Sequence, residues 1–388
     1  MRRHPVAELS WLEARTTAGK AVTALAPLLL PLADCAGLAL AQPLTALGDL
    51  PAFDTSAMDG YAVAGAGPWR VVGEVLAGAK WPHPLAEGTA VGIATGAPVP
   101  DGAGAVLPVE AAQRNGDRVD GPVTRGRHVR RRGEECRSGE LLVPAGTPVG
   151  AAVLGLSAAA GHDALLVHPL PRVVALVTGD ELLDRGLPGG ARVRDALGPQ
   201  LGRLVAGCGG ALAGRSHLPD DAALLLRAVA QADAEVVLTT GASSVGPADH
   251  LRPVLADLGA EVLVDGVACR PGHPQLLARL PDGRTVVGLP GNPLAAVVAA
   301  VTVLAPLLAA AGGRLPVPAR TGLLATAVRS APDATRLLPV RLAGLHAEPV
   351  RHTGSGMLRG AAMADALAVV LPGAAGAAGD EVELLPLP

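Results

Sequence analysis

The sequence predicts an α/β multidomain protein with one parallel α/β domain, a helical or extended N-terminal domain and two smaller β-rich domains. Between 171 and 313, apolar runs that end in glycine-rich turns alternate with helical stretches, which is typical of βαβ units. Short valine-rich runs between glycine and proline clusters fill 51–121 and about the last seventy residues. The 388 residues are 49% hydrophobic and 17% charged, so the chain can bury several cores and is not disordered in general.

The N-terminal half contributes elements of both kinds. The first 43 residues read as helical, with interruptions at Pro27 and Pro31. The runs 69–72 and 90–93 predict short strands, and 151–161 predicts a helix. The elements expected further along the chain are strands at 173–177, 236–238 and 286–287, a helix at 221–232 and a linker at 312–318.

One stretch has to be weighed against a membrane span. Residues 294–311 are 18 in number and carry no charge, which is the threshold length for a spanning helix. The stretch is rich in alanine and contains Thr302 and Pro306, while Asn292 and Pro293 suit the N-cap and the first position of an ordinary helix. We therefore expect a buried helix and no membrane association.

Composition argues against nucleic acid as a partner. The formal net charge is −3, and the chain has three Trp, one Tyr and one Phe, so it offers neither a strong basic field nor stacking platforms. The four cysteines form no C-x-x-C pair and no apolar signal segment begins the chain, so a cytoplasmic location is expected. No P-loop, H-E-x-x-H or G-x-S-x-G motif supports a zinc or nucleophilic mechanism.

Acidic side chains in glycine-rich turns are the first groups that can carry chemistry. Asp59 lies in the stretch 53–61, which holds the only Phe and the only Tyr of the chain, and a purely structural turn is the alternative there. Asp180 and Glu181 follow a strand and a glycine. They either favour a helix N-terminus or supply hard oxygen ligands for Mg²⁺.

Two further turns offer groups that bind anions. The small residues of 241–246 follow a strand and can hold a phosphate with backbone N–H groups, and Asp249 lies just beyond them. Arg270-Pro271-Gly272-His273-Pro274 is a stiff turn with two potential anion donors, or simply a tight loop. Because the carboxyl ends of parallel strands meet at one edge of a sheet, these turns together predict Mg²⁺-assisted chemistry on a phosphorylated ligand.

Seven motifs, in order along nearly the whole chain, resemble those of the molybdopterin molybdenumtransferases, the bacterial molybdenum insertases related to the E domain of gephyrin. The first is Phe53-Asp54-Thr55-Ser56-Ala57-Met58-Asp59-Gly60-Tyr61-Ala62-Val63. The others are 95–102 (TGAPVPDG), 131–134 (RRGE), 177–182 (VTGDEL), Thr239-Thr240-Gly241 with Ser244, Gly246 and Asp249, 288–293 (GLPGNP), and 354–358 (GSGML) with 366–372.

The resemblance implies a cytoplasmic homodimer of four domains. Residues 1–46 with 126–168 would form an N-terminal domain in two segments, and 47–125 would be a β-rich domain inserted into it. Residues 169–314 would form the α/β pterin-binding domain, which is similar to the pterin adenylyltransferases. Residues 315–388 would form the C-terminal β-rich domain.

The implied reaction takes adenylylated molybdopterin and molybdate, hydrolyses the adenylate and yields molybdenum cofactor and AMP, with Mg²⁺ or a similar divalent ion assisting. Transient contact with other proteins of molybdenum-cofactor biosynthesis is implied as well. The alternative is a non-catalytic paralogue that binds pterin or a partner as scaffold or sensor. A third interpretation is an adenylyltransferase, against which the extra β-rich domains and the Asp59 motif argue.

The resemblance also assigns the candidate site residues. Asp59, Glu181 and Asp249 would be the catalytic carboxylates and the metal ligands nearest the phosphoanhydride, and Thr95 would join them from the β-rich domain across the dimer. The substrate-binding residues would be Asp195, Gly241, Ser244, Gly246, Arg270, Pro271, Gly272, His273, Asn292 and Ser355.

The chain departs from the family pattern at several of these places. Arg270 and His273 stand in a turn that usually reads Lys-Pro-Gly-Lys-Pro, and an unperturbed histidine is charged only in part near pH 7. Ala242 replaces the second glycine of a Gly-Gly pair, Glu135 replaces an aspartate, and His128 stands where asparagine is common. His273 and Ala242 are the features that favour the non-catalytic alternative.

Overall fold

The computed structural model describes residues 8–241, 250–316, 318–374 and 376–388. The chain forms two compact units. The first, called here the α/β unit, consists of Met1–Leu28 and Val167–Pro388, and the second, the β-rich unit, of Leu29–Leu166. The segment before Leu29 thus clusters with the α/β unit, and 29–46 with the β-rich unit. The finer division into four domains remains a prediction.

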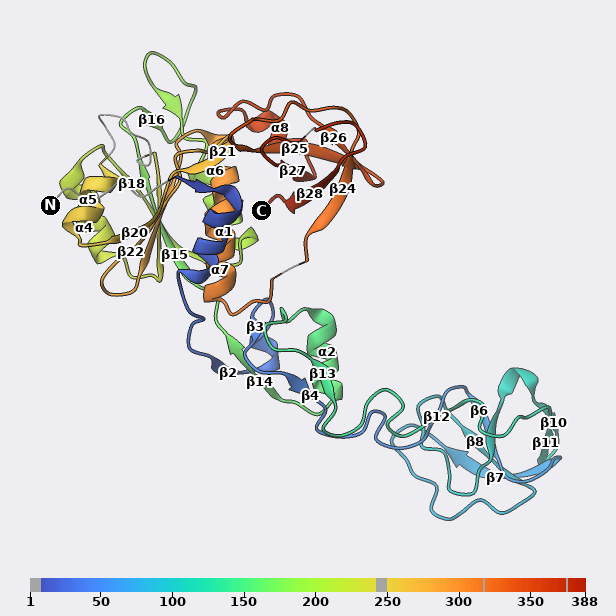
Figure 1. The fold of residues 1–388 in the computed structure, drawn as a ribbon. Helices are drawn as coiled ribbons and strands as arrows, with labels where there is room; N and C mark the ends of the chain where they lie inside the picture. The colour runs from blue at the N-terminus through green and yellow to red at the C-terminus, as the bar shows by residue number, and fades with distance from the viewer. Residues whose placement is uncertain (1–7, 242–249, 317, 375) are drawn as a thin grey trace. The chain divides into compact units, whose positions relative to one another are not determined.

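A six-stranded sheet forms the centre of the α/β unit (Figure 1). Its first four strands run parallel to one another. The fifth strand runs antiparallel to the fourth, and the sixth runs antiparallel to the fifth. The three strands predicted at 173–177, 236–238 and 286–287 are confirmed. Continuous aliphatic runs are typical of strands that are buried on both faces. The strand order is β18 (Ala211–Leu218), β15 (Arg172–Thr178), β19 (Val236–Thr240), β23 (Thr285–Leu289), β22 (Leu276–Arg279) and β20 (Glu261–Asp265).

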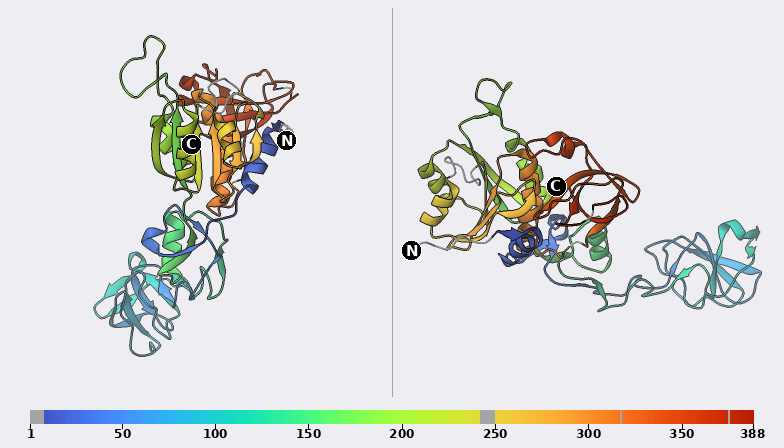
Figure 2. Two further views of the ribbon diagram at one scale, coloured as in Figure 1. Left: turned by 90° about the vertical axis from the view of Figure 1, so that its left-hand side faces the viewer. Right: turned by 45° about the horizontal axis from the view of Figure 1, so that its top comes forward.

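Helices cover both faces of this sheet (Figure 1 and Figure 2). The predicted helix at 221–232 is confirmed as α4 (Ala222–Gln231), and the Asp221 carboxylate caps it by accepting the Leu224 N–H at 2.8 Å. With α5 (Leu251–Asp257) it packs on one face. The helices on the other face are α1 (Trp11–Lys20), α3 (Leu201–Gly207), α6 (Pro293–Ala299) and α7 (Ala305–Ala311).

The apolar stretch is a buried helix with an irregular middle. Pro293–Ala311 is long and apolar enough to cross a membrane, with mean hydropathy 2.5, but 78% of its apolar window is buried in the fold. Between α6 and α7 the backbone forms a π-helical turn, Ala300–Leu304, in which the Ala305 N–H donates to Ala300 O. Pro306 has no N–H to continue the ordinary pattern. The displaced carbonyl of Val301 accepts instead from the Arg15 guanidinium of α1.

The last part of the α/β unit is β-rich, as expected. Five strands pair in a closed ring, so none of them presents a free edge. β21 (Val267–Arg270) pairs with one of these strands, and β1 (Leu9–Ser10) pairs with β21. The ring is formed by β24 (Arg320–Leu324), β25 (Thr335–Ala343), β26 (His346–Pro349), β27 (Ala366–Val370) and β28 (Glu381–Pro386), and α8 (Leu358–Ala362) follows β26.

The β-rich unit contains the strands and the helix expected there. The run 69–72 belongs to β7 (Trp69–Val75), 90–93 belongs to β8 (Thr89–Ile93), and α2 (Ala151–Ala159) is the predicted helix. The six-stranded sheet has the order β10 (Gln113–Asn115), β11 (Arg118–Asp120), β7, β8, β6 (Gly60–Val63) and β9 (Ala105–Pro108). Smaller sheets pair β2 (Leu28–Pro31), β14 (Ala164–His168) and β3 (Ala39–Leu40), β4 (Leu44–Thr45) with β13 (Leu141–Val143), and β5 (Thr55–Ser56) with β12 (Val129–Arg130).

The helical prediction for the first 43 residues is wrong beyond Lys20. Helix α1 ends there, and the chain continues as β2 and a 3₁₀ turn at Leu32–Asp34. Prolines fix φ and disfavour helical backbone in the residue before them, so Pro27 and Pro31 keep this segment extended. Alanine and leucine content alone was therefore a poor guide to the segment.

Candidate functional site

The carboxyl ends of two neighbouring central strands are joined by a hydrogen bond. β15 ends at Thr178 and β19 at Thr240, and the Thr178 Oγ1 donates to Thr240 O at 2.9 Å. Gly241 follows with φ +92°, and a Cβ there would lie 2.6 Å from Thr178 O. Only glycine meets both demands, which explains why the turn after β19 begins with this residue.

Helix α6 brings two more predicted residues to the same region. Asn292 occupies the N-cap and Pro293 the first helical position, as predicted, but the Asn292 side chain makes no capping hydrogen bond. The carbonyl of Ser355 accepts the Leu294 and Ala295 N–H groups instead, at 2.9 and 3.1 Å. The loop that carries Ser355 therefore closes this helix end, and the exposed Asn292 amide is left to face solvent or a ligand.

The predicted anion turn at 270–274 also packs against α6. A Cβ on Gly272, which has φ +104°, would lie 3.2 Å from Ala295 O, so the turn and the helix are in close contact. The Arg270 side chain is 66% exposed, and its guanidinium lies 3.7 Å from the Asp333 carboxylate. The register of β21 on β25 places Arg336 beside Arg270. Sequence reasoning missed Arg336, because no motif surrounds it and strand pairing alone brings it here.

His273 points at a carboxylate within this turn. Its Nε2 lies 3.1 Å from Glu8 Oε1, with 60% of the histidine side chain and 49% of the glutamate side chain exposed. Any positive charge on the imidazole is thus partly balanced by Glu8 before an anion arrives. A role of His273 in substrate binding remains a prediction.

The carboxylates that follow β15 lie in an exposed loop. Asp180 and Asp220 each accept the other's backbone N–H, at 3.3 and 3.4 Å. The exposed Glu181 side chain folds over Gly179, where a Cβ would lie 2.7 Å from Glu181 Oε2. This places several hard oxygen donors at the end of β15, next to the glycine turn after β19.

Asp195 is held by its own backbone neighbourhood. Its side chain is buried, and Oδ1 accepts the Leu197 and Gly198 N–H groups at 2.9 and 2.8 Å. The residue therefore holds the backbone at the point where the 3₁₀ turn Gly198–Gln200 begins. Because Oδ1 is fully used, only Oδ2 is left for a ligand.

In the β-rich unit, the structure brings the predicted residues Asp59 and Thr95 together. The Thr95 backbone N–H and Oγ1 both donate to Asp59 Oδ1, at 2.6 and 2.8 Å. These two bonds, the backbone one first, lower the pKa of Asp59 because they stabilise its charged form. Gly60 follows because a Cβ there would overlap the Leu107 carbonyl. Asp59 is thus an ionised carboxylate with a fixed direction.

The motif 131–134 forms structural contacts in the same unit. Asp54 accepts the Arg132 backbone N–H at 2.8 Å and the Arg131 guanidinium at 2.6 Å. These bonds, led by the backbone N–H, lower the pKa of Asp54. His128 has φ +60°, a conformation that Asn and His adopt more readily than most residues, so the departure from Asn at this position still meets the backbone demand.

Some predicted residues cannot be placed. Ala242, Ser244, Gly246 and Asp249 lie outside the described residues, and Asp59 and Glu181 belong to different units. Across the part of the chain that the structure describes, no three His, Cys, Asp or Glu side chains form a group that could hold a metal. The metal set Asp59, Glu181 and Asp249 therefore stays a prediction. A cavity of about 380 Å³ lies along β27 and β28, and none of the predicted site residues that the structure describes lines it.

Three family models match successive parts of the chain. The "MoeA N-terminal region (domain I and II)" matches 9–161, the "Probable molybdopterin binding domain" matches 174–310, and the "MoeA C-terminal region (domain IV)" matches 321–387. The crystal structure of the molybdopterin biosynthesis MoeA protein from Pyrococcus horikosii has a TM-score of 0.76 at 27% identity, covering 98% of this chain and 100% of that one. The predicted multidomain α/β fold is therefore confirmed at the level of this family fold.

Curated relatives extend the match to named enzymes. Molybdopterin molybdenumtransferase 2 of Mycobacterium tuberculosis (strain ATCC 25618 / H37Rv) is 36% identical over 317 residues, which cover 76% of this chain and 77% of the relative. Molybdopterin molybdenumtransferase of Synechococcus elongatus is 35% identical over 300 residues, or 72% and 74% of the two chains. With three models in order and relatives of this identity over about three quarters of both chains, the chain belongs to the molybdopterin molybdenumtransferase family.

Proposed function

We propose that the protein transfers molybdenum from molybdate to adenylylated molybdopterin, hydrolysing the adenylate and yielding molybdenum cofactor and AMP. The observation that carries this proposal is the carboxyl edge of the sheet, where Glu181, Gly241, Asn292 and Ser355 lie on adjoining elements. Ligands of open α/β sheets bind at this edge, which supports the proposal. The relatives are named for the transferase reaction, which favours an enzyme over a non-catalytic paralogue.

The turn at 270–274 would receive molybdate. Molybdate is a dianion at neutral pH, and Arg270 and Arg336 on neighbouring strands provide fixed positive charge for it. The glycine turn that begins at Gly241 and the exposed amide of Asn292 would bind the phosphate and pterin parts of the other substrate. Both substrates would then meet beside α6.

The described carboxylates suit a divalent ion. Asp180, Glu181 and Asp220 are oxygen donors of the kind Mg²⁺ prefers, and Glu181 would hold the ion together with Asp59 and Asp249. When bound, Mg²⁺ would neutralise negative charge on the phosphoanhydride. The chain's own part is to fix the carboxylates, as Thr95 does for Asp59 through two hydrogen bonds.

The hydrolysis needs a directed water molecule. Water adds to the phosphorus of the adenylate, the bond from that phosphorus to the pterin phosphate oxygen breaks, and AMP leaves. Asp59 would orient this water with Oδ2, since Oδ1 is held by Thr95. Its lowered pKa keeps it in the charged form at neutral pH.

We further propose a cytoplasmic homodimer with four domains, in which the α/β domain is related to the pterin adenylyltransferases. The family resemblance joins Asp59 and Thr95 of one subunit to Glu181 of the other. Mixing Asp59→Asn and Glu181→Gln subunits tests this. If each dimer site needs both residues from different subunits, an equal mixture regains about a quarter of wild-type activity. No regain on re-association would contradict a composite site.

The reaction itself is tested by reconstitution. Purified protein is given adenylylated molybdopterin, molybdate and Mg²⁺, and both AMP release and activation of a cofactor-free molybdoenzyme are measured. We expect both signals to depend on molybdate. Tight binding of adenylylated molybdopterin with no AMP release at any molybdate concentration would support the non-catalytic paralogue instead.

A further inference from the structure

The turn 270–274 has its carbonyl groups bonded toward the protein interior. The Pro271 carbonyl accepts the Cys269 thiol at 3.5 Å, and the Gly272 carbonyl accepts Gln275 Nε2 at 2.7 Å. The His273 carbonyl accepts the backbone N–H of Gln275 at 2.8 Å and that of Val267 at 3.0 Å. Three successive oxygen atoms, each of which would repel an oxyanion, are thus occupied by donors from within the fold.

Two backbone N–H groups of the turn are unused in the described part of the chain. Within the ranges that the structure describes, the Gly272 and His273 N–H groups make no hydrogen bond to the protein. Two adjacent backbone N–H groups beside an arginine form an arrangement that binds anions. Gly272 has φ +104°, which allows the chain to turn its N–H and its carbonyl to different sides.

Gln275 is the side chain that binds the Gly272 carbonyl. It is fully buried, and its Nε2 donates to both Gly272 O and Cys269 Sγ, the latter at 3.1 Å. Its Oε1 is buried with no hydrogen-bond partner in the described structure. Turning the amide round would place that oxygen against the Gly272 carbonyl, so the donor network fixes the amide orientation. A buried amide that leaves its oxygen unpaired is costly for packing alone.

We propose that Gln275 is a positioning residue for molybdate: it draws the Gly272 carbonyl inward and so leaves the N–H groups of Gly272 and His273 facing the anion. This rests on the proposed function, in which the turn receives molybdate. Cys269 is the second support, since its thiol links Gln275 to the Pro271 carbonyl. Burial raises the pKa of Cys269 to about 12, so the thiol stays protonated and can donate.

The test compares two buried polar residues in the full-length protein. Gln275→Met keeps the length of the side chain and removes its donors. Thr285→Val is the matched control, because Thr285 is also fully buried with an unpartnered Oγ1 but lies at the start of β23. For each variant, the molybdate Kd is measured by calorimetry with molybdate alone, and kcat and both KM values are measured by AMP release.

For Gln275→Met we expect the molybdate Kd and KM to rise about tenfold, with kcat and the KM for adenylylated molybdopterin within about twofold of wild type. Cys269→Ala, which retains the Gln275–Gly272 bond, should raise the molybdate Kd about threefold. Thr285→Val should change neither the molybdate Kd nor the molybdate KM. If Gln275→Met fails to fold, the Cys269→Ala result decides the proposal.

An unchanged molybdate Kd in folded Gln275→Met and in Cys269→Ala would overturn the positioning role while leaving the proposed function intact. A fall in kcat with unchanged molybdate KM would overturn it as well, since that pattern indicates general damage. Failure of the wild type itself to bind molybdate or release AMP would remove the proposed function and this inference together.

Discussion

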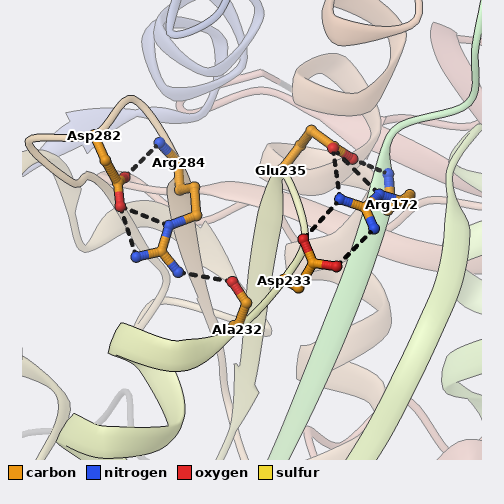
Figure 3. A network of polar contacts seen from close by, with 6 residues as sticks. All are labelled: Arg172, Ala232, Asp233, Glu235, Asp282 and Arg284. Atoms are coloured by element: carbon orange, nitrogen blue, oxygen red, sulfur yellow. Dashed lines mark hydrogen bonds and ion pairs between the residues drawn. The ribbon is translucent and has the colours of Figure 1, made fainter.

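The two ends of the α/β sheet hold their charged residues in different settings. At the amino ends, Arg172 at the start of β15 bonds Asp233 and Glu235 just before β19, at 3.1 to 3.3 Å between side chains (Figure 3). At the carboxyl ends, the strands lead into glycine turns, and the guanidinium of Arg270 lies 3.7 Å from its carboxylate neighbour. The amino end thus has a dense ionic network between neighbouring strands, and at the carboxyl end the predicted site residues Arg270 and His273 lie in an exposed turn, each facing one carboxylate.

The pKa shifts follow the same division. The bonds to Asp233 and then Glu235 raise the pKa of Arg172, and the Arg172 guanidinium lowers that of Asp233. Arg284, just before β23, binds Asp282 and also the Ala232 carbonyl at the end of α4, at 2.8 Å. A cation at a helix C-terminus is favourable. These ionic contacts stabilise the amino end of the sheet, which is remote from the proposed chemistry.

The largest expected difference between the two ends is in catalysis. Glu181→Gln at the carboxyl end should lower kcat by about 100-fold or more, because it removes a charge proposed to act on the transition state. Glu235→Gln at the amino end is the matched control and should leave kcat within about twofold. AMP release measures both. Equal activities for the two variants would remove Glu181 from the site and break the comparison.

Two glycines with the same φ provide a second contrast. Gly241 and Gly283 both have φ +92°, but a Cβ would meet Thr178 O at 2.6 Å in the first and nothing within 4 Å in the second. Gly241→Ala should cost about 2–3 kcal/mol of unfolding free energy and most of the activity, and Gly283→Ala about 1 kcal/mol with full activity. Urea unfolding measures the cost, and equal costs would show that the Thr178 contact is unimportant.

A third prediction concerns stability without function. Arg284→Met removes hydrogen bonds to the carbonyls of Val229, Ala230 and Ala232 and to Asp282, and the Arg284 side chain is only 22% exposed. The unfolding free energy should fall by about 1–2 kcal/mol, with kcat and both KM values unchanged. A loss of activity in a folded Arg284→Met protein would mean that the two ends are coupled.

The smallest expected effect is a pH dependence of stability. The Arg284 guanidinium lowers the pKa of Asp282, so the stabilisation by the ionised carboxylate is present above its ordinary pKa near 4 and is lost as pH falls through the lower folded value. Asp282→Asn should therefore be less stable than wild type above about pH 5, and the difference should shrink as the pH falls below the ordinary pKa of an aspartate. The difference is small because the Asp282 side chain is half exposed. A difference that grew on acidification would contradict the assignment.

Local patterns in the sequence predicted what is local in the structure. The strands at 173–177, 236–238 and 286–287, the helix α4 and the pairing of Pro293 with Asn292 were all predicted, because each depends on neighbouring residues. The family resemblance placed Asp59 and Thr95 in one cleft, but the two hydrogen bonds between them were not predicted.

Contacts made by strand register and by burial could not be foreseen in this way. Arg336 reaches Arg270 only because β21 pairs with β25, and Gln275 looks like one polar residue in an apolar run until its two bonds are seen. The segment after Lys20 was misread because its composition favours helix while Pro27 and Pro31 forbid it. Arg336 owes its position to a strand that is distant in sequence, and Gln275 owes its role to burial against the turn that precedes it.

The π-helical turn Ala300–Leu304 has a consequence for how the protein folds during its synthesis. Trp11 Nε1 donates to Thr302 Oγ1 at 3.2 Å, across 291 positions of the chain. Helix α1 therefore leaves the ribosome long before its docking surface exists, while Leu29–Leu166 is contiguous and can complete its fold in between. We expect α1 to stay undocked, with Trp11, Ala14 and Ala18 uncovered, until α7 emerges. The time spent in translating the middle of the chain sets how long that apolar face must be shielded.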